Sequence, residues 1–531
     1  MRRWTGSVSL LNPPGAVTAG QRARHRRLAL AIVCLAALII NVDNTILNVA
    51  LPTLVRDLHA TSSQLQWIVD SYAMVFAGLL LVGGTLADRF GRKRFFLIGL
   101  TVFALGSVGA ALSGSVITLI AFRALMGAGA ALTIPTSLAI INDIFRDPGE
   151  RARAIGVWGG TIGLGIAIGP IAGGLLLSRF WWGSIFLVNV PIALVGFLGG
   201  ALVVPDSKNP HVGRPDPVGA ALSIVGLGLL LWAIIEGPTR GWATGTVMGA
   251  GLGSLLVLGG FVLWESGSTH PMLKLEFFRE RRFSVALAAE CLAVFGLMGA
   301  LFLSTQFLQF DLGYSPLQAG LRILPIAVMV VVGAAVSPMV GRLVGDKFTV
   351  AAGLVSIAAG LWQVSASSQF DTTYGEVVLG LLLIGFGAGL MLPTATNSVI
   401  GSVPQGDSGM GSASNTVALQ VGGALGVAVI GSVMLTRYQG HMASALAGQH
   451  VPPSVAQTIF GSLGAALAFA ARVGGPSGVE LARVARTAFM SDNEVALAVG
   501  AIVAFAAAVL VLLALPSRAS AAQPPSAEPD R

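Results

Sequence analysis

The stretch GGTLADRFGRKR, from Gly83 to Arg94, decides how this chain folds. Apolar runs flank it on both sides, at 65–87 and at 95–115. An α-helix needs about 20 predominantly apolar residues to cross the hydrocarbon of a bilayer, and both runs reach that length. The stretch therefore predicts two transmembrane helices that are joined by a short polar turn.

The residues of this turn suggest how it is held. Arg89, Arg92 and the two bases that follow Arg92 would keep the turn at an anionic membrane face. Gly84 and Gly91 permit close packing and a tight turn, and Asp88 can accept hydrogen bonds or cap a helix. A simple basic anchor would explain the bases, but it would not explain the glycines or the aspartate.

The composition of the whole chain agrees with a membrane protein. Apolar residues make up 54% of the 531 residues, charged residues make up 11%, and the mean hydropathy is +0.80. Globular proteins carry about a quarter charged residues. Because helices satisfy their own backbone hydrogen bonds in lipid, the repeated apolar runs predict an all-α bundle. The net charge of +8 comes from bases beside the spans, so membrane lipids are expected as partners and nucleic acid is not.

Fourteen transmembrane spans are predicted. They lie at 28–52, 65–87, 95–115, 116–139, 153–177, 183–204, 216–236, 246–265, 284–309, 318–341, 348–368, 374–397, 412–436 and 495–515. An even number of spans puts both termini on one side, and most of the 32 Lys and Arg residues fall in segments on that side. By the positive-inside rule, both termini are expected in the cytosol and the protein in the inner (cytoplasmic) membrane.

An internal repeat predicts two related halves. GTLADRF begins at Gly84 after the second span, and GRLVGDKF begins at Gly341 after the tenth. Two six-helix bundles with two inserted helices between them fit this repeat. The expected units are a cytosolic tail at 1–27, a six-helix bundle at 28–204, a two-helix insert with linkers at 205–283, helices nine to thirteen at 284–436, an external loop at 437–494, the last span at 495–515 and a cytosolic tail at 516–531.

The segment 457–472 is apolar enough for a fifteenth span. A fifteenth span would place the C-terminus outside the cell. An amphipathic helix within the external loop is therefore the preferred interpretation.

Several motifs together resemble the major facilitator superfamily and, within it, the fourteen-span drug:proton antiporters. GGTLADRFGRKR resembles the loop between the second and third spans of that superfamily. VDNTILNVALP from Val42, RALMGAGAA from Arg123 and GSASNTVALQVGGALGVAV from Gly411 are similar to patterns in other spans. Met126 and Leu419 depart from the usual glutamine and arginine, which weakens the transfer of any specific substrate. The resemblance implies the major facilitator fold and a cytoplasmic gate made by Gly84, Asp88, Arg89, Gly91 and Arg92.

The fifth span carries a second motif, GLGIAIGPIAGG, which ends at Gly174. It resembles the motif that separates exporters from importers in this superfamily. Gly165, Gly169 and Gly173 are four residues apart and share one helix face, where another helix backbone could approach closely, and Pro170 bends the helix. The alternative is general packing of small residues without a role in transport.

Ionisable residues inside the spans are costly unless they are paired or hydrated, so each is a functional candidate. Asp43 and Arg123 lie at similar depths, about 13 Å and about 10 Å below the outer ends of their helices. We expect Asp43 to bind a proton and thereby release Arg123, and a static ion pair is the alternative. Asp70 could relay protons or attract cations, or be a solvated residue near a helix start. Glu290 could be a second proton site or face a cationic drug, or simply face water.

The expected function is export of drugs or antibiotic-like small organic molecules in exchange for protons. Trp67, Gln306 and Gln420 are candidate walls of the substrate cavity. An importer or symporter on the same fold and a transport-inactive sensor are the alternatives. The sequence has no phosphate-binding loop and no histidine-rich metal motif. We therefore expect a monomeric transporter, not an enzyme, that uses the proton gradient without cofactor or metal and has a small organic substrate and protons as partners.

Overall fold

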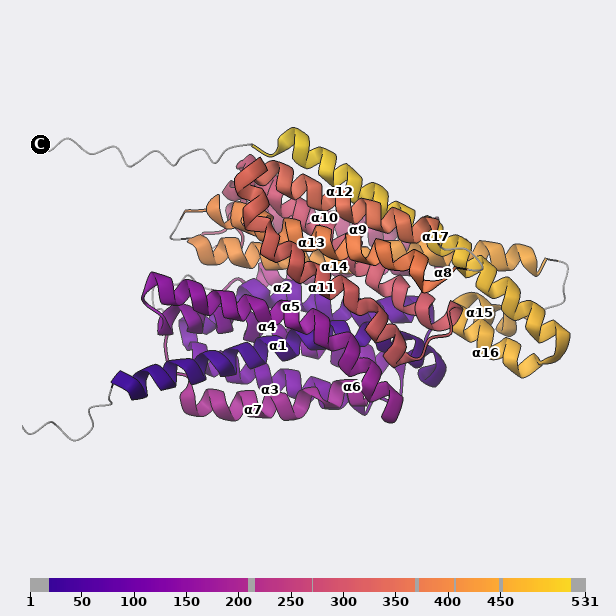
Figure 1. Cartoon of the computed structure of the whole chain (residues 1–531), viewed down its shortest axis with the longest axis horizontal. Coiled ribbons are helices and arrows are strands. Elements are labelled where there is room, and N and C mark those ends of the chain that lie inside the picture. The colour runs from indigo at the N-terminus through magenta and orange to yellow at the C-terminus, as the bar shows by residue number, and fades with distance from the viewer. Residues whose placement is uncertain are drawn as a thin grey trace, which may run out of the picture.

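Long α-helices run side by side through the computed structural model of this chain (Figure 1). The structure describes residues 19–208, 215–269, 271–367, 372–404, 407–447 and 452–516, and no strand occurs in these ranges. Fourteen helical segments of the described chain are long and apolar enough to cross a membrane. The predicted all-α fold with fourteen spans is thus confirmed.

The first half of the chain forms six spans. They are α1 (Ala19–Leu58), α2 (Ser62–Phe90), α3 (Arg92–Ala111), α4 (Val116–Ile144), α5 (Pro148–Arg179) and a sixth span made of α6 (Ser184–Leu187) and α7 (Asn189–Val203). Local signals fix the starts of three of these helices. Thr61 and Ser115 each make a capping box at the N-terminus of α2 and α4, and Asp147 caps α5 just before Pro148.

The rest of the chain forms the insert and the second half. The insert consists of α8 (Pro217–Arg240) and α9 (Gly245–Gly267), and the 3₁₀-helix η1 (Leu275–Arg279) follows it. The second half contains α10 (Arg281–Gln306) with the π-helical turn η2 (Phe307–Asp311), α11 (Pro316–Val344), α12 (Asp346–Ala366), α13 (Tyr374–Gly401), α14 (Ser408–Ala445) and α17 (Gly475–Ala514). Two short helices, α15 (Pro453–Gly461) and α16 (Leu463–Val473), lie between α14 and α17.

The two halves repeat the same packing. In the first half, α1 packs on α5, α2 and α3 pack on α4, and α7 packs on α1 and α3. The second half has the equivalent pairs: α10 packs on α14, α11 and α12 pack on α13, and α17 packs on α10 and α12. The repeated motifs occupy equivalent turns, where Gly91 (φ 122°) joins α2 to α3 and Gly345 (φ 87°) joins α11 to α12. Only glycine adopts such angles readily, which explains the glycine at each turn.

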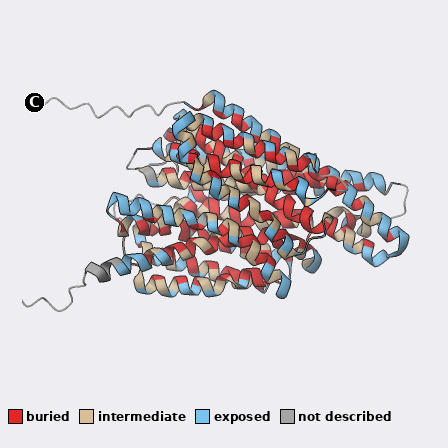
Figure 2. Cartoon of the chain, in the orientation of Figure 1, coloured by how far each residue is buried: buried red, intermediate tan, exposed pale blue. Residues whose placement is uncertain are grey.

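The halves meet mainly through two helix pairs, α2 with α14 and α5 with α11. Helix α8 packs on both α2 and α14, and α9 packs mainly on α8. The insert therefore lies beside one of the two seams between the halves. Buried residues concentrate along the middle of the bundle, and exposed ones lie on its periphery and at its ends (Figure 2).

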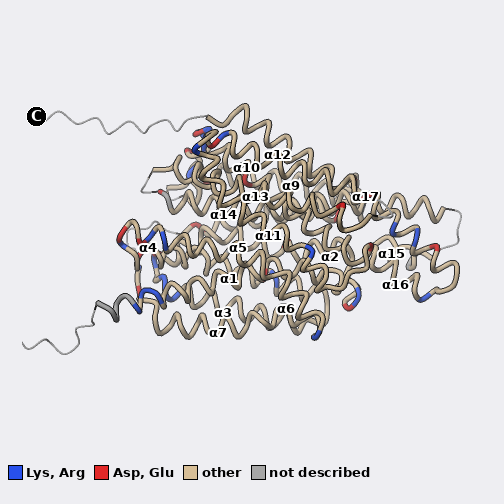
Figure 3. The backbone as a smooth tube through the Cα atoms, in the orientation of Figure 1, with Lys and Arg blue, Asp and Glu red and all other residues tan. Residues whose placement is uncertain are grey.

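The two ends of the bundle differ in charge (Figure 3). One end, which we name the basic end, carries the turns at 89–94, 146–153, 279–282 and 342–347. The other, which we name the distal end, carries α15 and α16. The described part of the chain begins and ends at the basic end, because α1 starts there and α17 finishes there (Figure 1).

Two segments differ from the sequence prediction. Residues 437–494, expected as an external loop with an amphipathic helix at 457–472, are more helical than expected where described. The short helices α15 and α16 cover the expected amphipathic segment, but α14 also extends to Ala445 and α17 begins at Gly475. Neighbouring helices support these extensions, since Tyr438 donates a hydrogen bond to the carbonyl of Ile459 (3.3 Å) and α16 packs on α17. Residues 19–27, expected in a tail, belong to α1; the rest of that tail and residues 517–531 lie outside the described residues.

Candidate functional site

A buried ion pair joins α1 to α4 in the first half. The Arg123 Nη1 atom lies 2.5 Å from the Asp43 Oδ2 atom, and both side chains are fully buried. Asn189 of α7 donates a second hydrogen bond to the other carboxylate oxygen of Asp43 at 2.8 Å. The structure thus brings together the two residues that the sequence predicted as a pair, and it adds a third helix to them.

The guanidinium of Arg123 has further contacts. Its Nε atom donates to the carbonyl of Ile68 at 3.1 Å, and its Cζ atom lies 4.4 Å from the centre of the Tyr72 ring. Its Nη2 atom has no hydrogen-bond partner among the described residues. A buried charge is costly without its counter-ion. The Asp43 carboxylate thus joins α1 to α4 through Arg123 and to α7 through Asn189.

Asp70 of α2 is fully buried, and neither of its carboxylate oxygens has a hydrogen-bond partner within the described chain. This burial contradicts the alternative of a solvated residue near a helix start. One turn before it, Gln66 donates to the carbonyls of Val427 and Ala428 in α14, at 3.4 Å each. Asp70 therefore lies on the same face of α2 as Gln66, in the seam between the halves.

Glu290 of α10 is fully buried too, so it does not simply face water. Thr396 of α13 donates a hydrogen bond to Glu290 Oε1 at 2.5 Å. With its amide nitrogen turned towards the carboxylate, Asn415 of α14 donates to both oxygens of Glu290. Glu290 thus has two neutral polar partners from different helices and no basic partner among the described residues.

The glycines of the fifth span bring α5 against α1. A Cβ atom at Gly165 would lie 2.6 Å from the Cβ atom of Asn41, and one at Gly173 would lie 2.8 Å from Ile46 Cγ1. A Cβ atom at Gly169 would collide with the side chain of Thr45. These approaches are closer than real Cβ contacts, so larger residues would push the helices apart.

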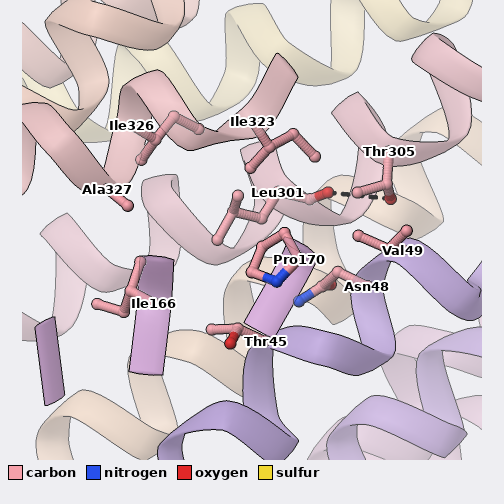
Figure 4. Close-up of a pocket in the computed structure, with 10 residues that line it drawn as sticks. All are labelled: Thr45, Asn48, Val49, Ile166, Pro170, Leu301, Thr305, Ile323, Ile326 and Ala327. Carbon is pink, nitrogen blue, oxygen red and sulfur yellow. Dashed lines mark hydrogen bonds between the residues drawn. The ribbon is translucent and has the colours of Figure 1, made fainter. Parts of the chain in front are cut away.

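The other end of the motif faces the second half. A Cβ atom at Gly174 would lie 2.5 Å from the Cα atom of Leu317, and Gly320 of α11 abuts the carbonyl of Pro170. The motif therefore lies between α1 and α11 and joins the two halves. Beside it is a small cavity of about 10 Å³, roughly the room for one water, into which Thr45, Asn48 and Pro170 project (Figure 4).

The halves are in contact at the distal end and separated at the basic end. Near the distal end, Gln309 of η2 donates a hydrogen bond to the carbonyl of Val49 in α1 at 2.9 Å. At the basic end, a cavity of about 570 Å³ lies between α2, α4 and α5 on one side and α14 on the other. We name it the basic-end cavity; its size falls within the range for drug-sized ligands.

The stretch from Gly83 to Arg94, which joins α2 to α3, lines this cavity. Gly84, Asp88 and Arg92 are among its lining residues, and Arg92 Nε donates to Asp88 Oδ1 at 2.7 Å. Arg89 instead lies over the ring of Phe90, with its Cζ atom 5.5 Å from the ring centre. The close approach of α4 falls at Gly83, where a Cβ atom would lie 2.5 Å from the carbonyl oxygen of Ala131, whereas Gly84 has ordinary room.

The candidate wall residues lie elsewhere. Neither cavity has Trp67, Gln306 or Gln420 among its lining residues. Trp67 packs against the cluster where α2, α8 and α14 meet, and the amide of Gln306 donates to the carbonyl of Phe302 in its own helix at 3.1 Å. Gln420 is half-buried in α14.

Sequence reasoning missed the neutral polar partners. Asn189, Thr396 and Asn415 each lie within an apolar run, and an amide or hydroxyl there is a detectable signal. The proton-coupling candidates were all ionisable side chains, so these three neutral residues were not among them. Trp158, Met272 and Met410, which line the basic-end cavity, carry no signal of this kind.

Comparison with known proteins agrees with the fold and the motifs. A model of the Major Facilitator Superfamily matches residues 33–427. The chain belongs to the major facilitator superfamily. Among solved major facilitator structures, it is similar to a bacterial homolog of the human lysosomal transporter Spinster in an inward-facing and unoccupied conformation. The TM-score is 0.65, with 18% identity over 94% of this chain and 99% of that chain, which supports the fold alone.

Several major facilitator relatives are more similar in sequence. The Multidrug efflux pump LfrA of Mycolicibacterium smegmatis is 34% identical over 91% of this chain and 95% of its own length. The Tetracenomycin C resistance and export protein of Streptomyces glaucescens is 32% identical over 93% of this chain and 92% of its own. The Multidrug resistance protein Stp of Mycobacterium tuberculosis is 38% identical over 77% and 76%. These relatives are transporters that carry out drug or antibiotic efflux. The family and fold that this chain shares with them are those of transporters.

Proposed function

We propose that this protein exports drugs or antibiotic-like small organic molecules across the cytoplasmic membrane in exchange for protons. The functions for which its relatives are named, multidrug efflux and tetracenomycin C export, support the export of such molecules. The observation that carries the proton exchange is the buried network of Asp43, Arg123 and Asn189.

The network offers two states. With Asp43 ionised, its attraction to Arg123 holds α1 against α4. A proton on Asp43 removes that attraction and leaves the buried guanidinium without a counter-ion, which favours an arrangement in which Arg123 reaches water or another acceptor. A proton entering from outside thus biases the bundle towards one conformation, and its release to the cytosol restores the other.

Other acids extend this scheme. We place Asp70 at the α2–α14 seam and Glu290 between α10, α13 and α14 as further protonation sites. Both are buried without a basic partner among the described residues, and a proton removes the cost of burying their charge. The glycines from Gly165 to Gly174 hold α5 close to α1 and α11, so that the distal end stays shut while the basic-end cavity accepts substrate.

The orientation follows from the charges at the ends of the bundle. We assign the basic end to the cytosol, with both termini there, because basic turns are retained on the cytoplasmic side. The basic-end cavity would then load substrate from the cytosol. The gate residues Gly84, Asp88 and Arg92 line that cavity, and Arg89 and Gly91 lie beside it in the same turn. The transporter would work as a monomer, with the proton gradient as its only energy source.

Transport in vesicles tests this function. Proteoliposomes that contain the protein are acidified inside, and the uptake of ethidium is followed by fluorescence. Protein molecules that are inserted inside-out should accumulate ethidium within the liposomes while the gradient is present. This uptake should stop when an ionophore collapses the gradient. The double variant Asp43→Asn with Arg123→Gln removes both charges together, so it should fold and bind but not accumulate substrate.

Two results would overturn the proposal. Accumulation by the double variant that still depends on the gradient would remove Asp43 from the coupling. Wild-type uptake that runs only in the direction of proton flow would indicate a symporter. The matched control is Glu236→Gln, since Glu236 pairs with Arg240 near the distal end of α8 and should leave uptake unchanged.

A further inference from the structure

The segment between α9 and η1 reaches into the basic-end cavity. Pro271 and Met272 line that cavity together with residues of α2, α4, α5 and α14. The Met272 side chain is buried, although residues 271–274 have no regular secondary structure. The cavity wall therefore includes a piece of the chain that belongs to neither six-helix bundle.

The insert holds this segment on one side. Glu265, buried at the end of α9, accepts a hydrogen bond from the backbone N–H of Leu273 at 3.1 Å. The carboxylate lies close to α8, because a Cβ atom at Gly219 would be 2.7 Å from its Oε1 atom. Trp264 donates its indole N–H to Asp216, the N-cap of α8, at 2.8 Å. The ends of α8 and α9 thus form a fixed support beside Met272.

The second half holds the segment on the other side. Lys274 Nζ lies 2.7 Å and 2.8 Å from the two carboxylate oxygens of Asp407, just before α14. Met272 is therefore anchored two residues away by an ion pair to the helix that forms the opposite wall of the cavity. Its position is set by these contacts, and it should move with α14 when the halves rearrange.

The aromatic and thioether side chains of the wall favour flat aromatic ligands. Met272 and Met410 supply two flexible, polarizable thioethers, and Trp158 supplies an indole ring. Thioethers make favourable contacts with aromatic rings and adapt to different shapes. The charged groups lining the cavity are already paired, Asp88 with Arg92 and Asp407 with Lys274, so they add little net charge.

We propose that Met272 is a specificity-determining residue, and that the insert exists in part to present it, with Met410 and Trp158, to polycyclic aromatic substrates. This inference rests on the proposed function, since it takes export to begin in the basic-end cavity. It assigns the two inserted helices a role in substrate choice in addition to their packing against α2 and α14.

Direct binding of ethidium to the purified full-length protein tests the inference without any proton gradient. Met272→Ala removes the thioether and should raise the Kd for ethidium about fivefold to tenfold, as expected for a few lost apolar groups in a pocket. Met272→Leu keeps the volume and should stay within about twofold of wild type. Met248→Ala is the matched control, because Met248 is exposed on α9 and away from the cavity.

A second measurement does not depend on affinity. In Met272→Cys, bound ethidium should slow the reaction of the new thiol with a maleimide, as located by peptide mass spectrometry. The thiol of Met248→Cys should react at the same rate with and without ethidium. Protection at position 272 alone would place the ligand against this segment.

The outcomes separate this inference from the proposed function. Equal Kd values for wild type and Met272→Ala, unprotected labelling at position 272, or no ethidium binding by wild type would each overturn the inference. Gradient-driven export that is unchanged in Met272→Ala would overturn the inference and leave the proposed function standing. Binding that depends on Met272 without any gradient-driven export would overturn the proposed function and leave the inference standing.

Discussion

Removing one charge from the Asp43–Arg123 pair should cost far more stability than removing both. Both side chains are fully buried, and the two atoms of the pair are 2.5 Å apart. Asp43→Asn leaves a buried guanidinium without its counter-ion, and such a change costs about 3 to 5 kcal/mol. The lower end is expected, because an amide oxygen can still accept one hydrogen bond from Arg123. Arg123→Gln leaves the Asp43 carboxylate buried, with Asn189 as its remaining hydrogen-bond partner among the described residues. It should cost a similar amount of stability.

The double variant Asp43→Asn with Arg123→Gln contains no buried charge at this site. We expect it to lose less stability than either single variant, so its free energy of unfolding should exceed the value predicted by adding the two single losses by more than about 3 kcal/mol. The assay is unfolding of the purified protein in mixed micelles of increasing SDS fraction, followed by far-UV circular dichroism. Glu236→Gln is the control, since the partly exposed Glu236–Arg240 pair should contribute less than about 1 kcal/mol. Strictly additive losses would show that the two charges do not stabilise each other, and the coupling scheme would lose its basis.

Two further predictions concern the fifth span and the second half. Gly169→Ala should slow ethidium uptake and lower the free energy of unfolding by about 1 to 3 kcal/mol, because its Cβ atom would meet the Thr45 side chain. Gly160→Ala in the same helix has open space and should have no such cost, so equal effects would contradict the packing argument. Glu290→Gln should keep polar contacts with Thr396 and Asn415 and reduce uptake of cationic substrates more than neutral ones in paired vesicle assays. Unchanged uptake of both classes would remove Glu290 from the mechanism.

Much of the candidate site could be anticipated, because its strongest signals are local. Asp43 and Arg123 stand out as charges within apolar runs, and depth along each helix suggested their pairing. The one-sided glycines of α5 follow from their spacing of four residues, which any α-helix places on one face. Asn189 could have been found by extending the search to neutral polar residues within spans.

Other parts of the site could not be anticipated from local patterns. The partners of Glu290 lie 106 and 125 residues further along the chain, as the hydrogen bond to Thr396 and the contact with Asn415 show. Which face of α10 meets α13 and α14 depends on the rotation and crossing of all three helices. Met272 is a second example, because its place in the cavity wall depends on the contacts that Glu265 and Lys274 make on either side of it. The extension of α17 to Gly475 was missed because hydropathy reports the apolar core of a helix and not its polar ends.

The sequence by itself determined the number of spans, the glycine turn at Gly91, and the close-packing face of α5. Each of these depends on properties summed over one segment: the apolar length needed to cross lipid, the φ angle that glycine alone adopts readily, and the 3.6-residue helical period. The tertiary structure alone decided that Asn189 completes the Asp43 network, that Asp70 lies in the seam between the halves, and that the insert contributes to the basic-end cavity. These facts depend on contacts between helices far apart in the chain, whose relative rotation is set by packing across the whole bundle.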